Sequence, residues 1–217
     1  LYESYVGGDT YQQGKHLFRY TNEKQDTYAT RMENTPLDNH CESVISVYNS
    51  FLFRETPTRD LPNLQGSDLE AFMKDADMDG RSMNNFMKEV ATWSSVYGHT
   101  WVLLAKPNIG AISLADEMTA GVRPYGTIIS PLTMIDWRYT KMPSGRYEVT
   151  YIKYIEDKQG DIVTIKEWSP EAIITSMVDL DDDILISQEL VDNNFGSIPV
   201  VCALAQVLGH WYNSQKI

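Results

Sequence analysis

The stretch from Ser82 to Pro107 constrains the fold of this chain more than any other, because it joins a helix pattern directly to a strand pattern. Gly98 can adopt the left-handed conformation that ends a helix. The apolar run Trp101–Ala105 then predicts a buried strand, which we expect to pack with the helix as the centre of the core. Apolar side chains recur at helical spacing before Gly98: Met83, Phe86, Met87, Val90, Trp93 and Tyr97.

The chain before this unit predicts mainly helices. Residues 1–20, with two adjacent glycines and several aromatic residues, predict an ordered arm with a turn rather than a regular element. Residues 22–34 predict a helix that Asn22 caps. Residues 36–53 predict a second helix, because Thr35 and Pro36 combine a cap residue with proline at the first helical position. We expect its apolar side to join the core: Leu37, Cys41, Val44, Ile45, Tyr48, Phe51 and Leu52.

The chain after this unit predicts mainly strands. Short helices are expected after the capping box at Ser67–Glu70 and after Ser113. Alternating residues and turn signals predict strands at 125–130, 135–139, 147–151, 162–168, 172–178 and 184–191, with 198–203 as a short strand or helix start. This order predicts an α+β fold with N-terminal helices, a central helix–strand core and a C-terminal antiparallel β meander. We expect an N-terminal arm with helices at 1–62 and an α+β domain at 63–217, which can join into one continuous domain.

The acidic charge limits the kinds of partner that the chain can bind. Thirty acidic residues against eighteen basic ones give a formal net charge of -12, which repels phosphate backbones. This argues against a protein that grips nucleic acid along its outside, although DNA could slide past it. No apolar run approaches the roughly 20 residues that span a bilayer, and no signal peptide is recognisable. Cys41 and Cys202 share no CxxC-type spacing, so we expect two small apolar core residues and no disulfide framework.

An acidic loop precedes the organising helix. Asp75, Asp77 and Asp79 match the first half of a calcium-binding loop, D-x-D-x-D-G. That loop needs a bidentate glutamate at its twelfth position, which is Phe86 here, and the nearest acid is Glu89, a helical turn further on. The simplest interpretation is an acidic turn ahead of a helix N-terminus, where the helix dipole favours negative charge. Calcium binding remains the alternative.

Other candidate sites carry weaker patterns. Asp179, Asp181, Asp182 and Asp183 predict a solvated hairpin tip. The chain contains no GxSxG, Walker A or GxGxxG motif. We therefore assign no catalytic, cofactor-binding or metal-binding residue and expect no enzyme, although carboxylates distant in sequence could still meet in space. The histidines show no metal-ligand spacing: His16, His40, His99 and His210.

Five stretches of the chain, in this order, resemble segments of one known protein family. The first is a glycine-bearing arm, Gly7–Tyr20, that leads into the Y-x-x-R of Tyr28–Arg31. The second is Asn39–Glu55, where an asparagine starts an apolar helix that ends in a Leu-Phe pair and a charge. The third is Leu69–Pro107, with a short helix, an Asp-Gly loop, a long helix and a strand ending in proline.

The last two stretches lie in the strand-rich half. Ile129–Trp137 is similar to a P-x-x-I-I-D-W segment, and Gly196–Val201 is similar to a G-x-I-P-V-V segment. Both segments are typical of phage portal proteins, the family that all five stretches resemble. Together the five stretches cover nearly the whole chain in the family's order. We expect the chain to be mainly the wing, the outer α+β portion of the subunit, with stem, clip and crown beyond Ile217.

The resemblance implies a structural role and no catalysis. Portal subunits form a ring, usually of twelve, at one vertex of the viral head, and double-stranded DNA passes through its channel during packaging and ejection without sequence-specific binding. The implied partners are other copies of the chain, terminase, a head-tail adaptor, capsid and scaffold proteins. The implied location is the virion, with assembly in the host cytoplasm. A cation-binding viral adaptor or tail module that uses the Asp75–Asp79 loop is the alternative from another class.

Overall fold

The computed structural model describes residues 1–217 except 14–15, 36–38, 59–67, 108–112 and 205–217. Its helices are α1 Tyr2–Val6, α2 Gly8–Gln13, α3 Gln25–Asn34, α4 His40–Leu52, α5 Asp68–Lys74, α6 Met83–Tyr97 and α7 Leu114–Thr119. Its strands are β1 His99–Ala105, β2 Tyr125–Ile129, β3 Met134–Lys141, β4 Tyr147–Gln159, β5 Ile162–Trp168, β6 Ala172–Asp179, β7 Ile184–Asp192 and β8 Val200–Leu204. Helices lead and antiparallel strands follow, which confirms the predicted α+β fold.

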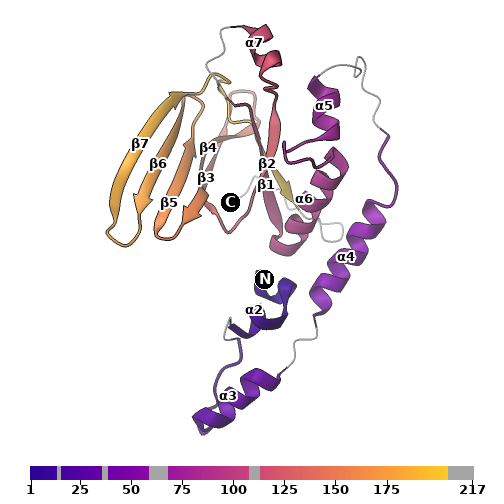
Figure 1. Ribbon diagram of the computed structural model, residues 1–217, viewed down its shortest axis with the longest axis vertical. Coiled ribbons are helices and arrows are strands. Elements are labelled where there is room, and N and C mark those ends of the chain that lie inside the picture. The colour runs from indigo at the N-terminus through magenta and orange to yellow at the C-terminus, as the bar shows by residue number, and fades with distance from the viewer. Residues whose placement is uncertain (14–15, 36–38, 59–67, 108–112, 205–217) are drawn as a thin grey trace.

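The strands form two antiparallel sheets. One sheet has the order β2-β1-β8, and the other is a five-stranded meander with the order β3-β4-β5-β6-β7. The predicted C-terminal meander is therefore confirmed. The segment predicted as a short strand or a helix start is strand β8, which leaves the meander and pairs with β1. In Figure 1 the five-stranded sheet extends to one side of β1 and β2, and α6 and α4 lie on the other side.

The predicted helix–strand unit is present as α6 followed by β1. The Ser82 side chain accepts a hydrogen bond from the backbone N–H of Asn85, and Gly98 ends the helix with a φ of 86°. Phe86 and Val90 of α6 are buried against the three-stranded sheet. Gly126 of β2 makes this packing possible, because a Cβ there would lie only 3.0 Å from the ring of Phe86. The helix pattern in the sequence therefore identifies a true core face.

A second apolar cluster joins the two sheets. Trp101, Leu103 and Ile129 of the three-stranded sheet pack against residues of the five-stranded one: Met134, Ile152, Tyr154 and Trp168, with Ile198 beside them. The rings of Trp101 and Trp137 lie 5.6 Å apart between centroids. β1 is therefore buried on both sides, by α6 and by the meander, as its continuous apolar run predicts.

The N-terminal arm is more regular than its sequence predicts. It forms two short helices, α1 and α2, separated at Gly7, which has a φ of 70°. The rings of Tyr2 and Tyr5 lie 6.3 and 6.0 Å from that of Trp93 on α6. Helices this short are only marginally stable alone, so packing against α6 stabilises them. The local sequence pattern could not reveal this long-range packing.

The next two helices start later than predicted. α3 begins at Gln25 with Lys24 at its cap position, so Asn22 is not the cap. Thr35 ends α3 as its C-cap residue, and Pro36 lies outside the described residues. Asn39 caps α4 instead: its side chain accepts from the backbone N–H of Glu42 at 3.3 Å and donates to the carbonyl oxygen of Tyr5 at 2.7 Å. The contact with α1 fixes this choice.

α4 does not bury the apolar side that the sequence assigns to the core. It faces α6 through Asn49, which is buried and donates a hydrogen bond to the hydroxyl oxygen of Thr92 at 2.7 Å. We call the exposed apolar side the α4 stripe, and its members are Cys41, Val44, Val47, Tyr48, Phe51 and Leu52. Ile45 is half-buried beside it, and Leu37 lies outside the described residues. The core placement predicted for this face, including that of Cys41, is wrong.

Candidate functional site

The acidic loop between α5 and α6 is anchored to the core. Ala76 is fully buried, its N–H donates to the carbonyl oxygen of Arg81 at 2.7 Å, and its carbonyl oxygen accepts from Gly126 at 2.7 Å. Met78 and Gly80 both have positive φ, at 67° and 89°. The loop is therefore a tight turn held against β2, with its carboxylates arranged by the turn.

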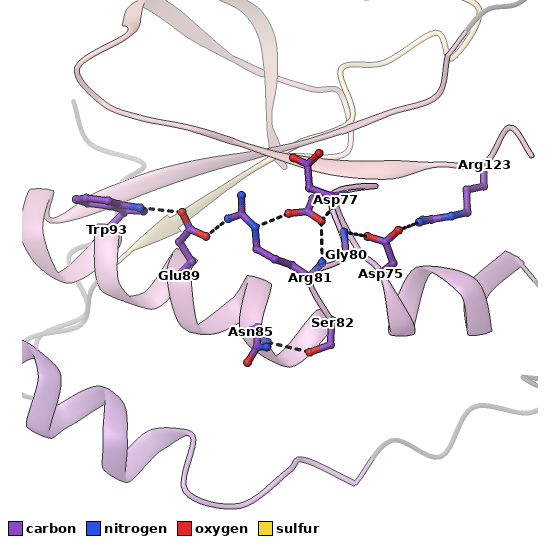
Figure 2. Close-up of polar contacts among 10 residues, drawn as sticks. Asp75, Asp77, Gly80, Arg81, Ser82, Asn85, Glu89, Trp93 and Arg123 are labelled. Atoms are coloured by element: carbon purple, nitrogen blue, oxygen red, sulfur yellow. Dashed lines mark hydrogen bonds and ion pairs between the residues drawn. The ribbon is translucent and has the colours of Figure 1, made fainter.

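The first two aspartates of the loop use their oxygens within the protein. Oδ1 of Asp75 accepts from the N–H of Gly80 at 2.9 Å, and Oδ2 lies 2.6 Å from the guanidinium of Arg123. Oδ1 of Asp77 accepts from the N–H groups of Asp79 and Arg81 at 3.0 and 3.2 Å. Figure 2 shows both carboxylates turned toward these donors. Arginines and backbone N–H groups thus occupy positions where a cation would sit.

A chain of polar contacts runs from the loop along α6. Nε of Arg81 lies 2.6 Å from Oδ2 of Asp77, and the other end of the guanidinium pairs with Glu89. Glu89 also accepts from the indole N–H of Trp93 at 3.3 Å. Figure 2 shows this row from the loop to Trp93. The row ties the loop to the helix and gives Glu89 a structural partner.

The electrostatics of Asp77 reflect these contacts. Burial alone would raise the pKa of Asp77, but the N–H groups of Asp79 and Arg81 and the charge of Arg81 outweigh it, so the pKa lies below its ordinary value. Hydrogen bonds to a carboxylate favour its charged form, so this residue is ionised at neutral pH. An ionised carboxylate suits both a structural turn and a metal ligand, so the pKa of Asp77 does not distinguish these two roles.

The geometry favours the structural turn. Phe86, at the position where calcium loops need glutamate, is buried in the core. Glu89 faces Arg81, whose positive charge lines the hollow of about 290 Å³ beside the loop. Within the described ranges, no group of three or more histidine, cysteine or acidic side chains could hold a metal ion. The loop fixes the start of α6, and the structure gives the calcium alternative no complete donor set.

The second acidic cluster forms the turn between β6 and β7. Asp181, Asp182 and Asp183 are exposed, and Oδ1 of Asp179 accepts from the N–H of Asp181 at 3.0 Å. This agrees with the predicted hairpin tip. Of the histidines, His16 pairs with Glu3, burial lowers the pKa of His99 beside Trp101, and His210 lies outside the described residues.

A hollow of about 470 Å³ between β8 and the start of β4 contains side chains that could take part in chemistry. It is lined by Tyr139, Glu148 and Cys202, among apolar residues. Burial raises the pKa of the Cys202 thiol to about 11 and that of Tyr139 to about 12. A thiol with so high a pKa is protonated near neutral pH, and the thiolate is the nucleophile. This hollow therefore offers no activated nucleophile.

Exposed apolar surface stands out more than any polar cluster. The side chains of Val44, Tyr48 and Phe51 on the α4 stripe are 53, 62 and 72% exposed. Every residue of β7 is exposed, including four large aliphatic residues that the edge of the sheet carries: Ile184, Leu185, Ile186 and Leu190. The sequence marks these residues as apolar, but it gives no signal that separates an exposed apolar face from a buried one.

The chain matches no known protein-family model and no curated protein. Among the described helices, none is both long enough and apolar enough to cross a membrane.

Proposed function

We propose that this chain is the wing of a phage portal subunit, a structural part of a ring at the head vertex through which DNA enters and leaves. The observation that carries the proposal is the α4 stripe, an apolar helix face left in solvent by a chain that buries a similar face of α6. The resemblance supplies the kind of assembly, and the stripe supplies a surface that such an assembly would cover.

The stripe is too apolar to be an ordinary solvent face. Burying one large apolar side chain is worth about 1.5–3 kcal/mol, so Val44, Tyr48, Phe51 and Leu52 together offer several kcal/mol to a partner. Contiguous exposed apolar patches of this kind mark interaction surfaces. In the proposed ring the stripe packs against the neighbouring subunit, and the polar side of the same helix, with Ser46 and Ser50, remains in solvent.

The charge of the chain suits a conduit. A net charge of -12 disfavours contact with DNA phosphates, and each such contact would add salt-dependent affinity that slows passage. Terminase, a head-tail adaptor, capsid and scaffold proteins are the further partners of the proposed ring. Nothing in this role requires a catalytic, cofactor or metal site.

Electron microscopy of the protein, purified in full length without other viral proteins, tests the proposal. We expect closed rings with a central channel wide enough for duplex DNA. Val44→Asp with Phe51→Asp should prevent ring formation, whereas Ser46→Asp with Ser50→Asp places the same two charges on the polar side of α4 and should leave rings intact. A folded monomer at micromolar concentration, or rings that form equally well with both double variants, would contradict the proposal.

A further inference from the structure

The five-stranded sheet has two open edges, and each belongs to a different part of the chain. β3 ends the sheet on one side and β7 on the other. No other described strand pairs with the outer side of either one. An edge strand presents a row of backbone donors and acceptors that can pair with another strand. In Figure 1, β7 lies at the outermost edge of the sheet, away from the helices.

β7 has few of the features that usually protect an edge strand. It is nine residues long, every residue is exposed, and it contains no proline and no lysine. Natural edge strands are blunted by such residues, by shortness or by a covering element. β7 carries one bulge: Met177 of β6 pairs with Ser187 and Val178 pairs with Leu185, so Ile186 has no partner on β6. The stretch from Ser187 to Asp192 is regularly paired. The remaining length of β7 is therefore available as a template for one more strand.

The charges on the two edges are opposite. The chain has no lysine or arginine from Trp168 to Gln215. Glu189 and Asp192 of β7 make no ion pair with any described residue. At the other edge, Lys141 ends β3, and Arg146 lies at the end of the β3–β4 turn, where its carbonyl oxygen accepts from the N–H of Met142. Neither Lys141 nor Arg146 pairs with a carboxylate in the described part of the chain. Arg138 already pairs with Asp136.

We propose that the β7 edge of one copy pairs with the β3 edge of a second copy, so that the five-stranded sheets of neighbouring subunits continue into one another. This inference rests on the proposed ring. Pairing between two different edges is a head-to-tail contact, which closes into a ring when the rotation fits. Lys141 on the β3 edge and Arg146 in the adjoining turn are positive, whereas Glu189 and Asp192 on the β7 edge are negative. This difference in charge favours pairing between the two different edges over pairing between two like edges.

The sheet order fixes the direction of the pairing. Successive strands of the meander are antiparallel, so β3 and β7, which are four strands apart in order, run in the same direction. Rotation about a ring axis keeps neighbouring subunits in the same orientation along that axis, so β7 and the incoming β3 are parallel. In a parallel pair the C-terminal ends of β3 and β7 lie side by side, which places Lys141 near Asp192. The β6–β7 turn at Asp181–Asp183 then lies at the opposite end of the pair.

Charge-reversal variants of the full-length protein test the pairing in low salt. One variant carries Glu189→Lys and Asp192→Lys, and the other carries Lys141→Glu and Arg146→Glu. Each alone should raise the concentration needed for half-maximal assembly by about tenfold or more, because like charges then face each other. An equimolar mixture of the two variants, or all four substitutions in one chain, should restore assembly. Circular dichroism confirms that each variant is folded.

A control places the same charge change on the same hairpin: Asp181→Lys with Asp182→Lys should leave assembly unchanged. If this tip variant blocks assembly and the Glu189 and Asp192 variant does not, parallel pairing is overturned. Rings that form unchanged from both reversal variants overturn the edge pairing and leave the portal role standing. Assemblies rescued by mixing that never close support the edge pairing and contradict the ring. A wild-type protein that stays monomeric contradicts both.

Discussion

Helices α6 and α4 have similar apolar patterns and opposite surroundings. On α6, Phe86 and Val90 are each 2% exposed, packed against the three-stranded sheet, whereas on α4 the corresponding apolar side is mostly in solvent. α4 contacts α6 through Asn49, a polar residue beside its stripe. Helical periodicity thus shows that a face is apolar, and it does not say whether the chain itself or another molecule covers that face.

The difference also separates two kinds of stabilisation. The apolar face of α6 contributes to the stability of the single chain, because its burial accompanies folding. The α4 stripe contributes little until a second surface covers it. Substitutions on the two helices should therefore change different observables: unfolding free energy for α6 and assembly for α4.

The largest expected effect on folding comes from α6. Phe86→Ala should lower the unfolding free energy by about 3–5 kcal/mol, because it removes a buried ring and leaves a cavity beside Gly126. Phe51→Ala on the α4 stripe is the matched control and should change it by no more than about 0.5 kcal/mol. Urea unfolding of the monomeric chain measures both. Equal losses from the two substitutions would remove the contrast between the helices.

The next effect comes from the loop that starts α6. Asp77→Ala leaves the N–H groups of Asp79 and Arg81 without their acceptor and should cost about 1–3 kcal/mol. The carboxylate of Asp79, in the same loop, makes no hydrogen bond in the described structure. Asp79→Ala should therefore lower the unfolding free energy by much less. Calcium should not raise the melting temperature of the wild-type chain. A large calcium-dependent rise that Asp77→Ala abolishes would restore the cation-binding hypothesis.

Acid should remove the same contribution. Because the folded-state pKa of Asp77 lies below its ordinary value of 3.8, its stabilisation is fully present above that pH and declines as the pH falls through the folded-state pKa. Unfolded aspartate has a pKa of about 3.9, so the carboxylate is ionised in both states between about pH 5 and 7. The difference in unfolding free energy between wild type and Asp77→Asn should therefore be constant in that range and shrink below about pH 4. A difference that grows in acid would contradict this assignment.

The smallest effect on the single chain is expected on the α4 stripe. Val44→Asp should leave the unfolding free energy within about 0.5 kcal/mol, since the side chain is mostly exposed. The same substitution should disrupt assembly, because it places a charge in an apolar contact. Urea unfolding and sedimentation of the same sample separate the two outcomes. A decrease of several kcal/mol in the unfolding free energy would mean that Val44 is buried in the single chain, and would contradict its exposed placement.

The sequence predicted those parts of the fold that local chemistry determines. Gly98 and the alternating strands of the meander marked their elements correctly, because a left-handed cap and a two-residue period leave direct traces in sequence. The start of α4 was missed because Asn39 gains a partner from α1, a contact between distant residues. The turn at Asp75–Gly80 was visible in the sequence, whereas the ion pair between Asp75 and Arg123 could not be inferred from spacing.

The exposed surfaces were beyond prediction for the same reason. Asn49 looks like an ordinary polar residue of an amphipathic helix, and only the fold turns it toward Thr92 and leaves Phe51 outside. The opposite charges of β3 and β7 are visible in the sequence, but their places at the two edges of one sheet follow from its order.

Cys41 gives the most direct test that another subunit covers the α4 stripe. It is a free and exposed thiol in the single chain, on the stripe itself. The measurement is its rate of maleimide alkylation, resolved by mass spectrometry, in assembled wild-type protein and in monomeric Val44→Asp. We predict slow alkylation in the assembly and rapid alkylation in the variant. Equally rapid alkylation of both would mean that the stripe stays in solvent and would contradict the account.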